Sequence, residues 1–230
     1  KIRQTDVLVE GLSDESFDLI ICAGHKEIIS TEFLKKNKVI NIHYSLLPKY
    51  RGLHSTVWAI INGEERLGLT IHEMNEKIDD GPIINQHAIL YDNQSAKEIM
   101  ELCNEYIKEN LAKILIKYKS GEIKPIPQQK DNATWVCKRN LDDCIVDFNL
   151  SVELLKRFFK ALVRPYPLPA IIINKNRYEI IKADFKSANY IMHNGRVVNI
   201  DEEGVWIKVK DGFIIIQELI DESGNSKYPV

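Results

Sequence analysis

Long apolar runs are missing from this 230-residue sequence, and none reaches the roughly 18 residues that a membrane-spanning helix requires. The start of the chain likewise lacks the apolar segment of a secretory signal peptide. Neither sign of charge is in excess, because 31 Lys and Arg stand against 33 Asp and Glu without an extended block of either. We therefore expect neither a membrane partner nor a nucleic-acid partner.

Cysteine is also scarce, with four residues at positions 22, 103, 137 and 144. None of the spacings is CxxC, so neither a metal site nor a disulfide framework fits them. All four lie in or near apolar segments, which favours reduced thiols in a cytoplasmic protein that holds no metal.

The first half of the chain alternates strand-like and helical segments. An apolar run at residues 17–24, a short helix at 31–36 and a strand at 38–43 form a βαβ unit. This unit predicts a parallel sheet with a right-handed crossover. Further segments predict a helix, two strands and a long amphipathic helix, at residues 55–62, 67–74, 83–89 and 95–121.

The second half of the chain begins at an extended, proline-containing linker at residues 124–129. A helix capped by Ser151 is expected to run to about residue 162, with Leu154 among its inward residues. Short β-rich runs at close spacing then predict a small barrel. They cover residues 170–174, 178–184, 196–200, 204–209 and 213–220. We expect two domains, at residues 1–123 and 124–230.

Two polar residues, Asn41 and His43, end the strand at 38–43, just before a turn rich in Ser, Leu and Pro. Because side chains at i and i+2 of a strand point to one face, both should face whatever lies beyond its carboxyl end. An amide donor beside a titratable ring can stabilise a developing oxyanion and move a proton. Asp79, in a turn after a later strand, joins them if the fold brings that turn over the strand end.

Each of these features also has a purely structural interpretation. An Asn-x-His sequence at a strand end is more often structural than catalytic, and residues 79–82 alone (Asp-Asp-Gly-Pro) are simply a turn. His72 and His87 lie within predicted strands, where packing or surface positions are the more common case. Lys49 and Arg51 either belong to a solvated loop or face an anionic ligand, and the sequence alone leaves both alternatives open.

Four motifs together resemble the formyltransferases that use 10-formyltetrahydrofolate. They are NIHYSLLPKYRG at residues 41–52, WAIINGE at 58–64, GLTIH at 68–72 and IDDGPII at 78–84. Residues 17–90 match the family without large gaps, and residues 134–220 are more weakly similar to its carboxyl-terminal barrel domain. The resemblance implies an α/β fold. It consists of a parallel, Rossmann-like formyltransferase domain, incomplete at its start, followed by a small OB-like β-barrel.

The resemblance also implies which residues are catalytic. Carried over residue by residue, the family's catalytic Asn, His and Asp fall on Asn41, His43 and Asp79. Asp79 is chosen over Asp80 because it lies two residues before Gly81, as in the family. Asn41 would stabilise the formyl oxygen, His43 would act as an imidazolium, and Asp79 would favour that charged ring.

Ligand contacts are implied in the same way. The family holds its folate cofactor, 10-formyltetrahydrofolate, through backbone groups of a loop that falls here on Glu27, Ile28 and Ile29, and it needs no metal. Three loop residues are expected near the acceptor substrate. They are Lys49, Arg51 and His54.

More than one acceptor is compatible with the resemblance. The residues at 48–52 and 58–63 look more like enzymes that N-formylate amino sugars. We therefore expect a dTDP- or UDP-linked 4-amino-4-deoxy sugar, as used in lipopolysaccharide O-antigen biosynthesis. Methionyl-tRNA formyltransferase is the alternative, because it has both domains, although it usually carries a basic surface for tRNA. The expected partner is thus a small nucleotide-sugar, and a homodimer is allowed.

The chain starts with Lys rather than Met, and a strand-like segment follows almost at once. The family pattern places additional strands and helices before Leu19, so we expect an amino-terminal portion to be absent from this sequence. If the natural chain does begin here, a non-catalytic binding remnant is the alternative of a different class. We favour trimming, because a complete Asn/His/Asp set is not expected to persist by chance in a remnant.

Overall fold

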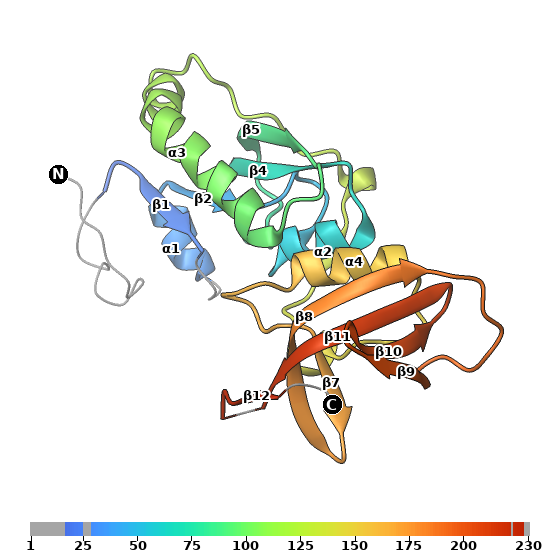
Figure 1. Ribbon diagram of the computed structural model, residues 1–230. Coiled ribbons are helices and arrows are strands. Elements are labelled where there is room, and N and C mark those ends of the chain that lie inside the picture. Colours follow the sequence, from blue (N-terminus) through green and yellow to red (C-terminus); the bar gives the residue numbers. More distant parts are fainter. Residues whose placement is uncertain (1–16, 25–28, 222, 228–230) are drawn as a thin grey trace. The chain divides into compact units, whose positions relative to one another are not determined.

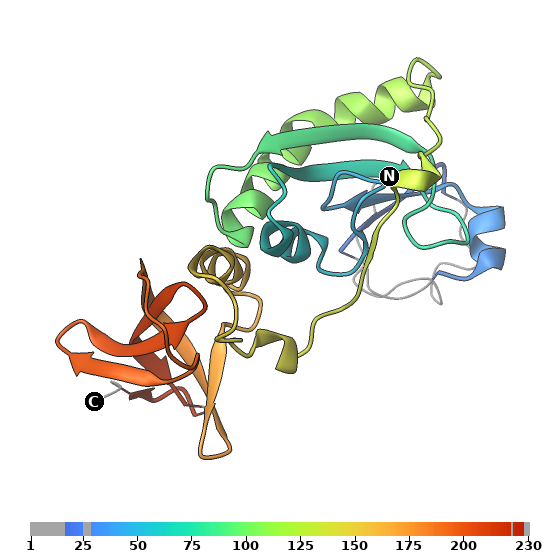
Figure 2. The ribbon, with the colours of Figure 1, turned by 90° about the vertical axis from the view of Figure 1, so that its right-hand side faces the viewer.

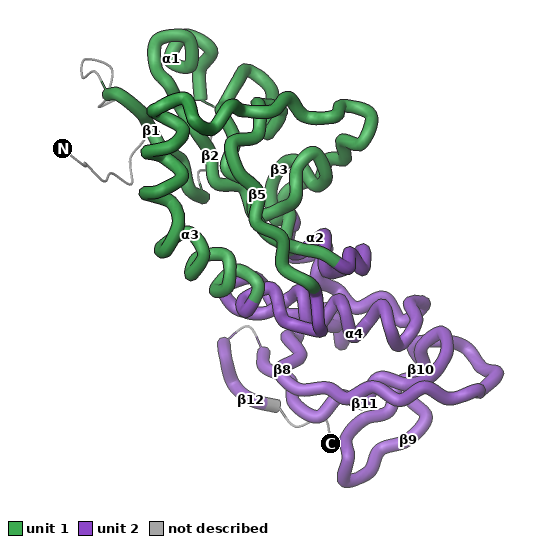
Figure 3. The backbone as a smooth tube through the Cα atoms, turned by 90° about the horizontal axis from the view of Figure 1, so that it is seen from above, with its two compact units in different colours: residues 1–56, 66–90, 99–138 green, residues 57–65, 91–98, 139–230 purple. Residues whose placement is uncertain are grey.

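The computed structural model describes residues 17–24, 29–221 and 223–227, and it divides the chain into two compact units (Figure 3). Unit 1 holds the described residues up to Thr56, together with Arg66–Leu90 and Ile99–Lys138. Unit 2 holds Val57–Glu65, Tyr91–Glu98 and the described residues from Arg139 onward. Residues 124–138 therefore group with unit 1, and the predicted domain boundary at residue 124 stays a prediction.

A four-stranded sheet of order β1-β2-β4-β5 forms the centre of unit 1 (Figures 1 and 2). Its strands, in chain order, are β1 (Ile20–Ala23), β2 (Val39–His43), β4 (Arg66–Glu73) and β5 (Ile83–Leu90). The predicted parallel pairing is confirmed for β1 and β2, which are connected through helix α1 (Thr31–Lys36). The strands β4 and β5 instead pair antiparallel, and β4 also runs antiparallel to β2. The short connection from β4 to β5 is the reason for their antiparallel pairing, because a parallel pair needs a crossover of a dozen or more residues.

Burial explains why β4 lies in the middle of this sheet. Six consecutive residues of β4, from Leu67 to His72, are buried, which is the pattern of a strand covered on both faces. The long helix α3 (Ala96–Lys119) lies along the sheet (Figures 1 and 2), and Tyr106 on it stacks on the ring of His87 from β5. The predicted capping box at its start is present, since Ser95 N donates to Glu98 Oε2 at 2.7 Å.

The segment after α3 belongs to unit 1 and makes backbone hydrogen bonds with its strands. Ile126 exchanges backbone hydrogen bonds with Ile83 at the start of β5. After the short helix η1 (Lys130–Asn132), strand β6 (Trp135–Val136) pairs parallel with β3 (Arg51–Gly52). This return of the chain brings residues 124–136 beside the loop that follows β2.

Unit 2 contains the last residues of α2 (Ser55–Asn62), helix η2 (Asp142–Cys144), helix α4 (Val152–Ala161) and an antiparallel sheet (Figure 1). The sheet order is β7-β8-β11-β10-β9, with β12 paired to β11. These strands are β7 (Ala170–Ile173), β8 (Asn176–Ser187), β9 (Val197–Asp201), β10 (Gly204–Val209), β11 (Gly212–Ile220) and β12 (Ser226–Lys227). The five predicted β-rich runs thus correspond to β7 through β11. The prediction that Leu154 of α4 points inward is wrong, because that residue is exposed.

Candidate active site

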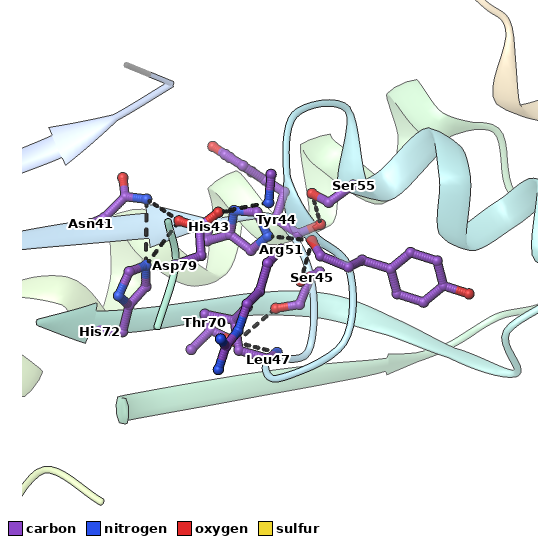
Figure 4. Close-up of polar contacts among 12 residues, drawn as sticks. Asn41, His43, Tyr44, Ser45, Leu47, Arg51, Ser55, Thr70, His72 and Asp79 are labelled. Atoms are coloured by element: carbon purple, nitrogen blue, oxygen red, sulfur yellow. Dashed lines mark hydrogen bonds and ion pairs between the residues drawn. The ribbon is translucent and has the colours of Figure 1, made fainter. Parts of the chain in front are cut away.

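Asn41, His43, His72 and Asp79 converge at one place in unit 1 (Figure 4). Asn41 and His43 lie two residues apart on β2, and the antiparallel register places His72 of β4 directly opposite Asn41. Asp79 comes from the loop between β4 and β5. The loop that contains Asp79 thus folds over the end of β2, and this brings Asp79 beside Asn41 and His43.

Asp79 is the centre of these contacts. Its Oδ2 accepts a hydrogen bond from the backbone N–H of Gly52 at 2.8 Å and lies 3.5 Å from His43 Nδ1. Its Oδ1 lies 3.4 Å from His72 Nε2 and accepts from Asn41 Nδ2 at 3.3 Å. The carboxylate thus has two rings and two N–H donors around it.

These neighbours decide the ionisation of Asp79. Burial by itself would raise the pKa of the carboxyl group, but the hydrogen bond from His72, the charge of His43 and the Gly52 N–H act against burial. The result is a pKa of about 2, below the ordinary value of 3.8. Asp79 is therefore an anion throughout the physiological pH range.

Burial has the larger effect on His43, whose ring is almost inaccessible to solvent. Desolvation lowers its pKa below 6.5, although Asp79 and the carbonyl of Tyr50 act to raise it and His72 acts to lower it further. At neutral pH the neutral imidazole is favoured. The resemblance implied that His43 acts as an imidazolium, and the sequence did not reveal how deeply the strand end is buried.

Hydrogen bonds fix the tautomer of each ring. His43 Nε2 lies 2.8 Å from the carbonyl oxygen of Tyr50, and His72 Nδ1 lies 2.7 Å from that of Glu73. Because a carbonyl only accepts, each of these nitrogens carries the hydrogen of the neutral ring. The other ring nitrogens, His43 Nδ1 and His72 Nε2, face Asp79, and each donates to the carboxylate when its ring carries a second proton.

The turn after β2 is held in place by side chains of neighbouring elements. Thr70 on β4 accepts from the N–H of Leu47 at 3.1 Å and donates to the carbonyl of Ser45 at 2.7 Å (Figure 4). The hydroxyl of Ser55 donates to the carbonyl of Tyr44 at 3.0 Å. These bonds satisfy buried backbone groups of an irregular segment, so the end of β2 keeps one conformation.

A second polar cluster supports the loop that carries Asp79. The guanidinium of Arg51 pairs with Asp80, with Nη1 2.6 Å from Oδ1, and donates to Gln128 Oε1 from Nη2 at 2.7 Å. Gln128 Nε2 donates to the carbonyls of Asp79 and Gly81, each at 2.8 Å. Arg51 also lies over the ring of Trp135, at 5.5 Å from its centroid.

The remaining predicted contact residues lie in three different settings. Glu27 and Ile28, expected to bind the folate, fall outside the described residues, whereas Ile29 is buried in a core cluster with Phe33 and Val39. In the turn after β2, Lys49 is exposed and His54 is half-buried. Arg51 is 3% exposed and bound within the protein. Substrate contacts by Lys49, Arg51 and His54 stay predictions.

His72 and Gln128 are the site residues that the sequence did not single out. His72 was expected to be a packing or surface residue, and only the pairing of β4 with β2 shows that it lies opposite Asn41. Gln128 lay in an apparent linker.

Among residues 17–24, 29–221 and 223–227, no group of three or more His, Cys, Asp or Glu is arranged to hold a metal ion, and no helix there is both long and apolar enough to span a bilayer.

Comparisons with known proteins agree with this fold. A formyl transferase family model matches residues 3–116, and a model of the formyl transferase C-terminal domain matches residues 139–227. The chain is 31% identical over 215 residues to methionyl-tRNA formyltransferase from Mesoplasma florum. The aligned region covers 90% of this chain and 67% of that protein. The chain belongs to the formyltransferase family, whose members are enzymes that transfer formyl groups.

Two solved structures show the same arrangement. WlaRD, a sugar 3N-formyl transferase crystallised in the presence of dTDP and 5-N-formyl-THF, is 27% identical with a TM-score of 0.65, covering 86% of this chain and 71% of WlaRD. HypX from Aquifex aeolicus, in complex with tetrahydrofolic acid, has a TM-score of 0.68 at 24% identity over 91% of this chain. This chain spans 36% of HypX, and the likeness to HypX shows the fold alone. The predicted α/β domain followed by a β-rich domain is confirmed.

Proposed function

We propose that this protein transfers the formyl group of 10-formyltetrahydrofolate to the primary amine of a nucleotide-linked 4-amino-4-deoxy sugar. The observation that carries the proposal is the convergence of Asn41, His43 and Asp79 at the end of β2 in a chain of this family. We keep the backbone of residues 27–29 as the proposed contact for the folate.

Catalysis would begin with attack of the neutral amine on the formyl carbon. A carbon–nitrogen bond forms, negative charge develops on the formyl oxygen, and the attacking nitrogen becomes positive. Asn41 is assigned to the developing oxyanion, for which one donor of this kind contributes about 3–4 kcal/mol. Both Nδ2 hydrogens of Asn41 now face Asp79 and His72, at 3.3 and 3.4 Å, so one of them must turn to the substrate.

The proton of the attacking amine then has to leave. Asp79 is a weak base because its pKa is about 2. His43 in its neutral form is a better acceptor at Nδ1, and Asp79, 3.5 Å from that atom, stabilises the imidazolium that results. The same proton can be returned to the departing nitrogen of tetrahydrofolate as its bond to the formyl carbon breaks. Protons and charges then balance over the cycle.

Two acceptors compete, and different observations favour each. Similarity to methionyl-tRNA formyltransferase over 90% of the chain favours the tRNA. The similarity to WlaRD favours an amino sugar. The charge of residues 125–230 also favours the sugar, because fifteen Lys and Arg stand against fourteen Asp and Glu. A protein that binds the tRNA backbone needs an excess of basic groups to replace counterions on the phosphates.

The test offers the protein 10-formyltetrahydrofolate with either a dTDP-linked 4-amino sugar, the matching 3-amino sugar or methionyl-tRNA. We expect mass spectrometry to show one added formyl group on the 4-amino sugar and none on the tRNA. Formylation of methionyl-tRNA alone would replace the acceptor that we propose. Binding of the folate without transfer to any of the three would support a binding protein and contradict the catalytic assignment.

A further inference from the structure

Gln128 lies outside the proposed catalytic set, yet its side chain is bound at every polar position it has. Its Nε2 donates to the carbonyls of Asp79 and Gly81 at 2.8 Å each, and its Oε1 accepts from Arg51 Nη2 at 2.7 Å and Nε at 3.2 Å. We infer that Gln128 is a positioning residue, which holds the loop of Asp79 so that its carboxylate faces His43. The inference rests on the proposed function for its catalytic meaning.

The orientation of the Gln128 amide follows from its partners. A side-chain amide has two N–H donors and an oxygen with two lone pairs, and here all four are used. A flipped amide would place its oxygen against two carbonyl oxygens and its NH₂ against a guanidinium. Only one orientation is therefore compatible with these neighbours, and Gln128 is only 8% exposed.

The loop of Asp79 needs support from outside itself. Asp79 has a φ of +49°, in the left-handed region that residues other than glycine adopt at a conformational cost. Its carbonyl and that of Gly81 both receive their hydrogen bonds from Gln128. A Cβ at Gly81 would overlap the carbonyl oxygen of Glu73, so the loop is also closely packed against the end of β4.

Arg51 extends this support to the other side of Asp79. Its guanidinium binds Asp80 and Gln128, while the next residue, Gly52, donates its N–H to Asp79 Oδ2 at 2.8 Å. The backbone of Asp79 is thus held through Gln128 and its side chain through Gly52. Arg51, which links the two, points to Asp80 and Gln128, and this agrees with a supporting role for its guanidinium.

Loss of this support has a specific electrostatic consequence. Three groups from different elements face His43 among the described residues: the carboxylate of Asp79, the ring of His72 and the carbonyl of Tyr50. Asp79 and the Tyr50 carbonyl raise the pKa of His43, and the His72 ring lowers it. If Asp79 retreats while His43 stays buried, the pKa of His43 falls, because the charge that raises it has moved away. If Gln128 stabilised the fold without positioning Asp79, its loss would leave the pKa of His43 unchanged.

The test compares Gln128→Met, which keeps the length and removes all four hydrogen bonds, with Gln129→Met at the exposed neighbouring position. For Gln128→Met we expect kcat to fall about 10- to 100-fold with KM unchanged, as for a catalytic group displaced by about 1 Å. The acid limb of the pH–rate profile should move to lower pH. Gln129→Met should match the wild type in all three respects.

A second readout does not depend on turnover. NMR titration of labelled His43 should show a lower pKa in Gln128→Met than in wild type and Gln129→Met. An unchanged His43 pKa, or a kcat equal to that of Gln129→Met, would overturn the inference. If wild-type protein formylates no acceptor while the His43 titration still shifts, the proposed function fails and the positioning role stands. Should Gln128→Met not fold, Gln128→Leu also removes all four hydrogen bonds without adding a charge, and it must give the same shift.

Discussion

Asp79 should make the stability of this protein depend on pH in a defined window. Its pKa is about 2 in the folded protein and 3.8 without these neighbours, so the anion is favoured by folding. A group whose pKa is lowered on folding contributes stability above its unfolded pKa and loses that stability as the pH falls through the folded value. The window for Asp79 therefore lies between about pH 4 and pH 2.

The magnitude follows from the same two values. A change from 3.8 to about 2 corresponds to ~2.5 kcal/mol at neutral pH, of which ~1 kcal/mol is lost by pH 3. The side chain of Asp79 is only 11% exposed, so solvent screening removes little of this contribution. The matched variant is Asp79→Asn, which keeps the shape and the acceptor for Gly52 but cannot ionise.

The assay is urea unfolding of wild type and Asp79→Asn at pH 7, 5, 4 and 3, followed by circular dichroism. Other carboxylates titrate in both proteins, so only the difference between their unfolding free energies is interpreted. We expect this difference to shrink by about 1 kcal/mol between pH 5 and pH 3, the range in which Asp79 itself titrates. A difference that stays constant down to pH 3 would refute the argument that Asp79 is stabilised as an anion.

Three further substitutions test separate parts of the site. Asn41→Ala should lower kcat about 10²- to 10³-fold through the lost oxyanion donor, and a near-wild-type rate in formylation kinetics would contradict its role. His72→Leu removes a hydrogen bond that lowers the pKa of Asp79, so carboxyl NMR should find a higher pKa there, and an unchanged value would count against the contact. Gly81→Ala should destabilise the fold by about 2–4 kcal/mol, because its Cβ would overlap the carbonyl oxygen of Glu73, whereas an unchanged melting temperature would show that the loop adapts.

The sequence predicted those parts of the structure that depend on local pattern. The apolar run before Asn41, the Ser95–Glu98 capping box and the Ser151 cap each specify an element through neighbouring residues. The pairing of Asn41 and His43 on one face follows from the period of a strand. The spacing of the later β-rich runs likewise indicated the antiparallel sheet of unit 2.

What the sequence could not provide is long-range register. His72 joins the site because β4 runs antiparallel to β2 with Asn41 opposite it, which nothing within β4 specifies. Gln128 is polar and lies between prolines and charged residues, so its own neighbourhood is typical of a solvated linker. Its burial appears only when the segment after α3 folds back along β5 and β3. The neutral state of His43 is likewise a consequence of burial by residues distant in sequence.

The central claim is that the Asn41, His43 and Asp79 constellation transfers a formyl group to an amino sugar. The most direct measurement is the single-turnover rate of formyl transfer from 10-formyltetrahydrofolate to a dTDP-linked 4-amino sugar, in wild type and in folded His43→Ala. We predict rapid formylation by the wild type and loss of most of that rate in the variant. Formylation of the sugar at a near-wild-type rate by folded His43→Ala would contradict the account.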